Sequence, residues 1–145
     1  AFNKLSEIAK EISEESPIEG ILICEMIDNG VETVLGVVKD PVFGPTVMFG
    51  LGGIFIEILK DVTFRVAPFD AKEAHMMINE IRGRAILDGV RGAPPVDVDA
   101  LAEALSQLSL FAATNIDNVD SIDLNPFIVL PRGAKIVDAL IIASD

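Results

Sequence analysis

The stretch GVVKDPVFGPTVMFGLGGIFIEILKDVTFR, residues 36–65, decides the fold of the first half of this 145-residue chain. It contains short runs of β-branched and other apolar residues, separated by turn signals at Asp40-Pro41 and Gly44-Pro45. Runs of this length that are bounded by Pro and Gly predict strands joined by tight turns. We expect strands in four ranges: 31–39, 46–49, 54–59 and 62–67.

Three glycines lie among residues 50–53, between two of these expected strands. Glycine lets backbone N–H groups approach a ligand closely, and the resulting concavity suits phosphate. A tight turn between two strands explains the same glycines without any ligand. The sequence leaves both interpretations open.

The N-terminal part predicts one helix and one further strand. Apolar side chains recur at helical spacing over residues 3–15, which predicts an amphipathic helix. Residues 21–27 form an apolar run that predicts a strand. Asn29-Gly30 stands between this run and residues 31–39, and Asn-Gly between two β-rich runs predicts a hairpin.

The second half predicts two helices, joined by a Gly- and Pro-rich loop over residues 83–95. Asp70 and Glu73 form a capping box at the start of the first helix. Either Asp97 or Asp99 caps the second helix, which we expect to end at Asn115. The expected buried side chains of the two helices are Ala74, Met77, Ile78 and Ile81, and then Leu101, Ala104, Leu105, Leu108, Phe111 and Ala112.

The chain closes with two expected strands, residues 122–130 and 134–143, around a turn at 131–133. Strands are thus followed by two helices and a hairpin, without a regular βαβ alternation. This order favours an α+β fold in which a mostly antiparallel sheet carries its helices on one face.

Composition excludes some classes of partner. The net charge of −12 argues against binding nucleic acid through its phosphates. No apolar run reaches the roughly 18 residues that a membrane span needs, and no secretory signal is visible. The single cysteine, Cys24, lies in an apolar run, and a buried free thiol fits a reducing cytoplasm. We therefore expect a cytoplasmic protein without nucleic-acid or membrane partners.

The closing hairpin carries a candidate metal site. Asp123 and Asn125 are two residues apart on an expected strand, so they share one face. If Leu130 pairs with Gly133, counting outward places Asn125 opposite Asp138, where an amide oxygen and a carboxylate can share Mg²⁺. A glycine bulge at the turn would separate the pair, and a polar cluster at a strand end is the plain alternative.

The motifs also carry a family resemblance. The stretch DPVFGPTVMFGLGGIFIEILKDVTFRVAP, residues 40–68, resembles the ATP-grasp domain of the NDP-forming acyl-CoA synthetases, the group that includes ADP-forming acetyl-CoA synthetase. The similarity extends to GVRG at 89–92 and to DLNPFIV and GAKIVDALI within 123–141, and it covers the chain from about Gly20 onward. It implies that residues 1–145 form a single ATP-grasp C-terminal lobe of a larger synthetase. The CoA-binding part and the N-terminal ATP-grasp lobe would be absent.

The resemblance implies ATP or ADP and Mg²⁺ as ligands. Similar enzymes place metal-binding Asn and Asp at the positions of Asn125 and Asp138, with Asp123 beside them or at a second metal. The segment that reads adenine matches Glu25, Met26 and Ile27, and Glu32 matches the acidic residue that holds ribose hydroxyls. The alternative is that Glu25 and Glu32 are solvated carboxylates on alternating strands.

Two residues are catalytic candidates. Arg65 and Glu57 come from expected neighbouring strands, where a guanidinium oriented by a carboxylate suits a transferred phosphate. Arg91, in the GVRG motif, is a weaker candidate, and a surface salt bridge is the ordinary alternative for either arginine. His75, the single histidine, is predicted to lie on the surface of a helix. The phosphohistidine of the resembling enzymes belongs to other segments.

The function that the resemblance implies is the nucleotide- and Mg²⁺-binding part of an enzyme that converts acyl-CoA, ADP and phosphate to a carboxylic acid, ATP and CoA through a phosphohistidine held elsewhere. Its partners would be the CoA-binding and N-terminal ATP-grasp portions, in the same chain or in another subunit. The alternatives are a regulatory ATP-grasp-like domain of a protein lysine acetyltransferase and a succinate–CoA ligase β-like subunit. We expect the isolated chain to be inactive, and to form homo-oligomers through apolar surface that the missing lobe would cover.

Overall fold

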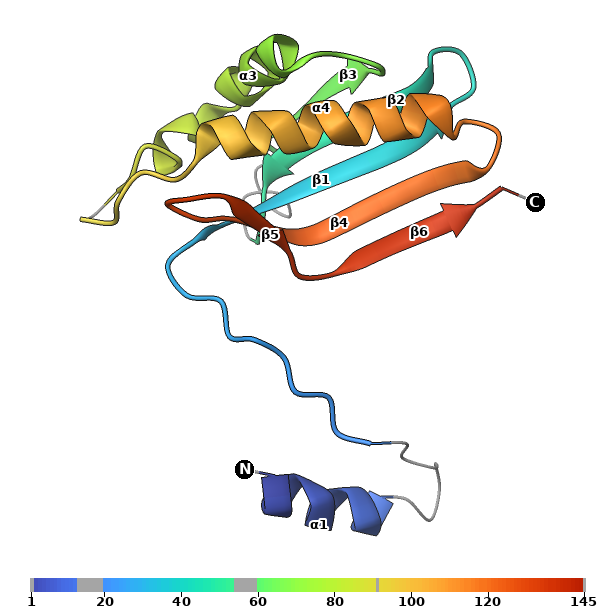
Figure 1. The fold of residues 1–145 in the computed structure, drawn as a ribbon. Coiled ribbons are helices and arrows are strands. Elements are labelled where there is room, and N and C mark those ends of the chain that lie inside the picture. The colour runs from blue at the N-terminus through green and yellow to red at the C-terminus, as the bar shows by residue number, and fades with distance from the viewer. Residues whose placement is uncertain (1, 13–19, 54–59, 91, 145) are drawn as a thin grey trace.

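The computed structural model describes residues 2–12, 20–53, 60–90 and 92–144, and it has the expected α+β fold. One antiparallel sheet runs in the order β3-β2-β1-β4-β5, and β6 also pairs with β4 (Figure 1). The strands are β1 (Val31–Asp40), β2 (Gly44–Leu51), β3 (Val62–Val66), β4 (Val119–Val129), β5 (Ala134–Ile136) and β6 (Ala139–Ala143). The helices are α1 (Phe2–Ile12), α3 (Ala71–Glu80), α4 (Val98–Thr114) and the 3₁₀ turn η1 (Arg82–Ile86).

Helices α3 and α4 cover one face of the sheet, as predicted (Figure 1). Side chains alternate between the two faces of a strand, so every second residue of the central strands points at these helices. Leu35, Val47 and Phe49 point this way and are completely buried. They meet Leu101 and Leu105 of α4, which are also fully buried. This layer between helices and sheet is the hydrophobic core, and we call its side of the sheet the covered face.

The opposite side of the sheet carries no helix among the described residues, and we call it the open face. Its side chains are the ones that alternate with the core residues of β1, β2 and β3. Many of them are apolar too, but Val38, Phe64 and Val66 are each about half exposed, at 52%, 51% and 50%. The open face is therefore an apolar surface in contact with solvent.

Local capping signals placed both covering helices correctly. The Asp70 carboxylate accepts a hydrogen bond from Glu73 N at 2.9 Å, and the Asp97 carboxylate accepts one from Ala100 N at 3.0 Å. These bonds satisfy backbone N–H groups that the first turn of a helix leaves unpaired. The second helix ends at Asn115, as predicted. The predicted loop after α3 contains η1, which the sequence analysis missed.

The buried side of α3 is as predicted, whereas that of α4 differs at several positions, and Ala102 is fully buried although it was not expected there. Phe111 was expected in the core but is 44% exposed, and Ser109 is fully buried instead. Ser109 is tolerated there because its hydroxyl accepts from Phe69 N at 3.1 Å and donates to nearby backbone carbonyls. A hydrophobicity pattern cannot identify a polar residue whose hydrogen bonds come from a distant loop.

The expected strand over residues 21–27 is wrong. This segment is extended but belongs to no strand, and it carries exposed side chains such as Leu22 and Ile23. The reason is topological: β1, its expected partner, already pairs with β2 on one edge and with β4 on the other. Cys24, expected to be buried, is exposed for the same reason. The expected strand at 54–59 lies outside the described residues.

The Asn29-Gly30 hairpin is also wrong, although Asn29 does adopt a positive φ of 64°. The chain continues through this point instead of folding back (Figure 1). The glycine serves a close approach between segments, because a Cβ at Gly30 would lie 2.2 Å from Ile128 Cγ2 of β4. The signal at Asn29-Gly30 thus marks the entry into β1.

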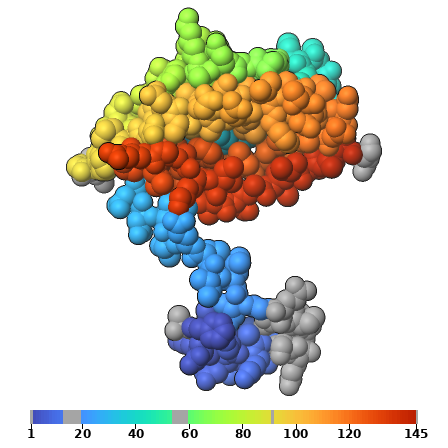
Figure 2. Space-filling view, viewed as in Figure 1, coloured from blue at the N-terminus to red at the C-terminus, as the bar shows by residue number. Residues whose placement is uncertain are grey.

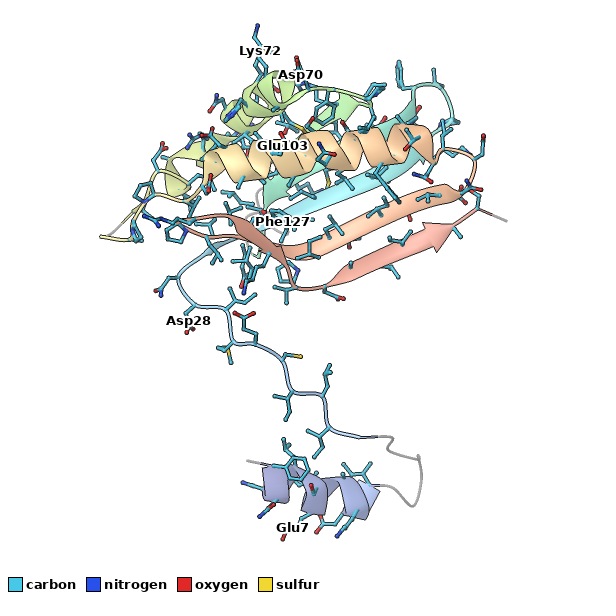
Figure 3. All side chains as sticks on the ribbon, in the orientation of Figure 1. Glu7, Asp28, Asp70, Lys72, Glu103 and Phe127 are labelled. Atoms are coloured by element: carbon cyan, nitrogen blue, oxygen red, sulfur yellow. The ribbon has the colours of Figure 1, made fainter. Side chains whose placement is uncertain are left out.

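Helix α1 is confirmed over Phe2–Ile12, while residues 13–15 of the predicted helix lie outside the description. It lies apart from the sheet, beyond the extended residues 20–28 (Figures 1 and 2). Figure 3 shows Glu7 on this helix and Asp28 on the extended segment, both away from the sheet. None of the residues of α1 is buried. No helix in the described part of the chain has the length and apolar character that crossing a membrane requires.

Candidate functional site

The open face contains a hollow above the middle of the sheet. Its floor is apolar, and polar side chains of β4 stand at one side. The residues that line it are Val34, Gly36, Val37, Val38, Met48, Phe64, Ser121, Ile122, Asp123 and Asn125. The hollow holds about 350 Å³, toward the lower end of the roughly 300–1,000 Å³ that is usual for small-ligand sites. An apolar floor with a few convergent polar groups is the usual composition of such a site.

The register of the closing hairpin is the predicted one. Leu130 N donates to Gly133 O at 2.9 Å, and counting from that pair places Asn125 opposite Asp138. The two residues are joined directly, since Asn125 N donates to Asp138 O at 3.2 Å. The bulge at Gly133 that would have separated the pair does not occur, although Gly133 has a positive φ of +72°. Asn125 and Asp138 are both exposed.

The single strand expected over 134–143 is instead two strands, β5 and β6, with Val137 and Asp138 between them. Here β4 also shifts its register against β1, between the pairs Thr33↔Phe127 and Leu35↔Leu124. The extra residue falls at Asn125-Pro126. Proline has no N–H to donate, so a ladder is commonly interrupted or bulged where it stands. The irregularity lies at the candidate metal position.

The chemistry of this donor set fits a hard cation. Asn125 and Asp138 supply an amide oxygen and a carboxylate, and Asp123 lines the same hollow as Asn125. Among the described residues, no three His, Cys, Asp or Glu side chains gather closely enough to hold a metal on their own. Mg²⁺ does not require such a cluster, because it is usually held by one or two carboxylates together with water and phosphate oxygens. The metal assignment stays a prediction.

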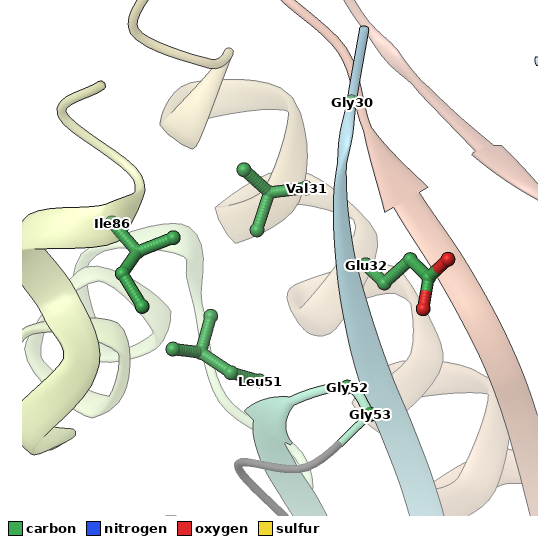
Figure 4. A pocket seen from close by; sticks show the side chains of 7 residues that line it. All are labelled: Gly30, Val31, Glu32, Leu51, Gly52, Gly53 and Ile86. Carbon is green, nitrogen blue, oxygen red and sulfur yellow. The ribbon is translucent and has the colours of Figure 1, made fainter. Parts of the chain in front are cut away.

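Glu32 lies beside a second hollow, shown in Figure 4. Val31, Leu51 and Ile86 point toward one another on one side of β1, while the Glu32 side chain points to the other side (Figure 4). Gly52 approaches Glu32 closely: its N donates to Glu32 O at 2.8 Å, and a Cβ on Gly52 would lie 3.1 Å from Glu32 Cβ. This contact explains one glycine of the 50–53 turn, and it leaves the exposed Glu32 carboxylate available to a ligand.

The expected adenine-reading segment is attached to the sheet by an ion pair. Glu25 Oε1 lies 2.6 Å from Lys135 Nζ of β5. Met26 is 82% exposed and Ile27 is half-buried. The sequence analysis did not identify Lys135, and no local signal could have done so, since the two partners are 110 residues apart. The pair places Glu25 beside the same hairpin that carries Asp138.

Arg65 is bonded to helix α3. Its Nε lies 2.6 Å from Glu73 Oε1 and its Nη2 lies 2.5 Å from Glu80 Oε1. These bonds raise the pKa of the guanidinium, with Glu80 the larger cause and Glu73 the smaller, and Arg65 in turn lowers the pKa of Glu80. Arg65 pairs with the core residue Val47, so it rises from the covered face. Its expected partner Glu57 and the weaker candidate Arg91 both lie outside the described residues.

His75 lies on α3 as expected, with a side chain that is 38% exposed. Its Nε2 is 3.2 Å from Asp99 Oδ1 at the start of α4. The contact joins the two covering helices on the side away from the open face.

The comparisons with known proteins show the family to which the chain belongs. Residues 1–143 match the ATP-grasp domain family. The β subunit of ADP-forming acetate–CoA ligase II from Pyrococcus furiosus is 43% identical over 143 residues, which cover 97% of this chain and 61% of that subunit. The chain therefore spans about three-fifths of the length of this relative.

Two solved structures of dinucleotide-forming acetyl-coenzyme A synthetase 1 from Ca. Korarchaeum cryptofilum are similar in fold. One, in complex with coenzyme A, acetyl-coenzyme A and a phosphorylated phosphohistidine segment, has a TM-score of 0.87 at 44% identity, covering 96% of this chain and 63% of that one. The other, with coenzyme A and Mg-AMPPCP, has a TM-score of 0.84 at 42% identity, covering 98% and 64%. Matched along nearly all of its length by the family and by these relatives, the chain belongs to the ATP-grasp domain family.

Proposed function

We propose that this chain is the nucleotide- and Mg²⁺-binding part of an NDP-forming acyl-CoA synthetase. The reaction of the complete enzyme would be acyl-CoA + ADP + phosphate ⇌ carboxylic acid + ATP + CoA. The observation that carries the proposal is the position of Asn125 opposite Asp138 beside the apolar hollow of the open face, in a chain 43% identical to an acetate–CoA ligase subunit. These relatives are ligases, which favours a catalytic role over a regulatory one.

The residues around the hollow would bind different parts of a Mg²⁺–nucleotide complex, according to their chemistry. The apolar floor, which includes Met48 and Phe64, gives a flat surface on which a base or ribose can rest. Asn125 and Asp138 would hold a cation by two oxygens, with Asp123 beside them. When bound, Mg²⁺ neutralises phosphate charge, which phosphoryl transfer depends on more than on covalent help from the protein.

The segment around Glu25, Met26 and Ile27 would read adenine, and Glu32 would accept hydrogen bonds from ribose hydroxyls. The Lys135–Glu25 ion pair supports the first assignment, because it holds this segment near the hairpin that carries Asp138. Arg65 remains a proposed phosphate contact, oriented by Glu57. It rises from the covered face, so it would reach a phosphate only at the β3 edge of the sheet, after exchanging one of its two bonds to α3.

The test of the cation site is Asp138→Ala in the complete synthetase. Removing one of two protein oxygens should abolish Mg²⁺-dependent ATP formation, while circular dichroism stays unchanged because the side chain is exposed. Asp117→Ala is the matched control, since it removes an exposed carboxylate from the turn between α4 and β4. Mg²⁺-dependent activity that survives in Asp138→Ala, or that is lost equally in Asp117→Ala, would contradict the proposal.

We also propose that residues 1–145 alone are catalytically inert and bind nucleotide weakly. The open face supplies one wall for a nucleotide, and catalysis requires the reacting groups to be held at close distance. The phosphohistidine and the CoA site would come from other parts of the enzyme. Calorimetry with ATP or ADP and Mg²⁺ should show weak binding, and no ATP should form from acyl-CoA, ADP and phosphate. Micromolar affinity or turnover by this chain alone would refute this part of the proposal.

A further inference from the structure

Asp97 contacts two parts of the fold that are distant in sequence. As the N-cap of α4, its Oδ1 accepts from Ala100 N at 3.0 Å. Its other oxygen, Oδ2, accepts from Gly133 N at 2.8 Å, in the turn between β4 and β5. The bond from Gly133 is the larger of two causes that lower the pKa of this carboxyl, and the bond from Ala100 is the smaller. Both oxygens are therefore engaged, one by a helix and one by a hairpin.

The backbone of Asp97 completes the link. Its N–H donates to Leu130 O at 2.8 Å. In a four-residue turn, the C=O of the first residue usually accepts from the N–H of the fourth, here Leu130 O and Gly133 N. In this turn each of those two groups bonds to Asp97, one to its backbone and one to its side chain. Leu130 N and Gly133 O bond to each other directly, so Asp97 takes up the two turn groups that this bond leaves unpaired.

This turn sets the register of everything that follows it. The register that pairs Leu130 with Gly133 continues through β5 and places Asp138 opposite Asn125. A slip of one residue would move every later side chain to the other face of the sheet. We propose that Asp97 is a positioning residue for the cation site, holding Asp138 opposite Asn125 by fixing the β4–β5 turn. The inference rests on the proposed function, and it adds a residue outside the hollow itself.

Asp70 offers a matched comparison. It caps α3 as Asp97 caps α4, with an oxygen that accepts from Glu73 N. Asparagine is as good an N-cap as aspartate, so Asp70→Asn and Asp97→Asn should both keep their helices. An asparagine at position 97, however, has one oxygen for two N–H groups, those of Ala100 and Gly133. Asp97→Asn therefore loosens the turn, and Asp70→Asn does not.

The experiment measures how ATP formation by the complete synthetase depends on Mg²⁺ concentration. For Asp97→Asn we expect the Mg²⁺ concentration for half-maximal activity to rise about 10-fold or more, as is typical when residues that orient metal ligands are changed. Its kcat at saturating Mg²⁺ should stay close to that of the unmodified enzyme. Hydrogen exchange should accelerate in residues 119–143. Asp70→Asn should change neither the Mg²⁺ dependence nor this exchange.

The outcomes separate two kinds of failure. If Asp138→Ala abolishes activity but Asp97→Asn leaves the Mg²⁺ dependence unchanged, the positioning role is wrong and the cation site stands. An equal shift in Asp70→Asn and Asp97→Asn would also overturn the role, since it would reflect a general effect of weaker capping. If Asp138→Ala retains Mg²⁺-dependent activity, the cation site itself is wrong.

Discussion

The covered and open faces of the sheet are built from similar residues but differ in what they contact. On the covered face, Phe49 and Val47 are completely buried beneath α4. On the open face of the same strands, Phe64 and Val66 are about half exposed. Polar groups differ as well: Ser109, on the covered side, has hydrogen-bond partners within the chain, whereas Asn125 and Asp123 line a hollow that is open to a ligand.

This difference shows which parts of the chain serve stability and which serve binding. A packed core fixes the sheet from one side, so the other side can keep apolar and acidic groups exposed without losing the fold. Exposed contiguous apolar surface on a folded domain usually marks a site for another molecule or another part of the protein. The open face fits this description. The predictions below compare the effects of changing residues on the open face and on the covered side.

The largest effect is expected when an aromatic residue is removed from each face in turn. Phe49→Ala empties a fully buried position and should lower the free energy of unfolding by about 3–5 kcal/mol. Phe64→Ala changes a half-exposed position on the open face and should cost about 1 kcal/mol or less. Urea denaturation of both variants measures the contrast. Equal losses would mean that the open face is part of the core.

The features that sequence reasoning found are those fixed over short distances. The caps at Asp70 and Asp97 and the hairpin closed at Gly133 each depend on a few neighbouring residues, and all three are confirmed. The expected strand over 21–27 is wrong because both edges of its partner β1 are occupied, one by the next strand β2 and the other by β4, which is distant in sequence. No local pattern in that segment reports this.

In the candidate site, too, contacts that are local in sequence were predicted and contacts between distant residues were not. The position of Asp138 opposite Asn125 follows from counting along one hairpin, so the sequence alone predicts it. The Lys135–Glu25 ion pair joins residues 110 positions apart, and the bond between Asp97 and Gly133 spans 36. Such contacts require the whole sheet and helix arrangement, which is why sequence reasoning treated Asp97 only as a possible helix cap.

A moderate effect is expected at Arg65, which joins the edge strand β3 to α3 from the covered side. Arg65→Lys keeps the charge, but a lysine cannot bridge Glu73 and Glu80 with a planar fork. Glu80 is exposed and Glu73 is partly exposed, so solvent weakens both pairs and the loss of stability should be about 0.5–1 kcal/mol. Thermal unfolding measures it. If the stability is unchanged while the complete synthetase loses its dependence on phosphate, Arg65 contacts the substrate and not α3.

The smallest effect is expected in the pH dependence of stability. Replacing Asp97 should change this dependence, whereas replacing a carboxylate of the open face should not. Hydrogen bonds from Gly133 and, secondarily, Ala100 hold the pKa of Asp97 below its ordinary value of 3.8. A carboxyl whose pKa is lower in the folded state stabilises the fold above its unfolded pKa, and this stabilisation is lost as pH falls through the folded value. Asp97→Asn should therefore unfold at a lower temperature than the unmodified chain at pH 7. The difference in unfolding temperature between this variant and the unmodified chain should become smaller below about pH 4, as Asp97 itself becomes protonated.

Asp123→Asn, which removes a carboxylate from the open face without touching the turn, should show no comparable difference in unfolding temperature at pH 7. If the difference in unfolding temperature between Asp97→Asn and the unmodified chain stays the same at low pH, the charge of Asp97 does not hold the turn.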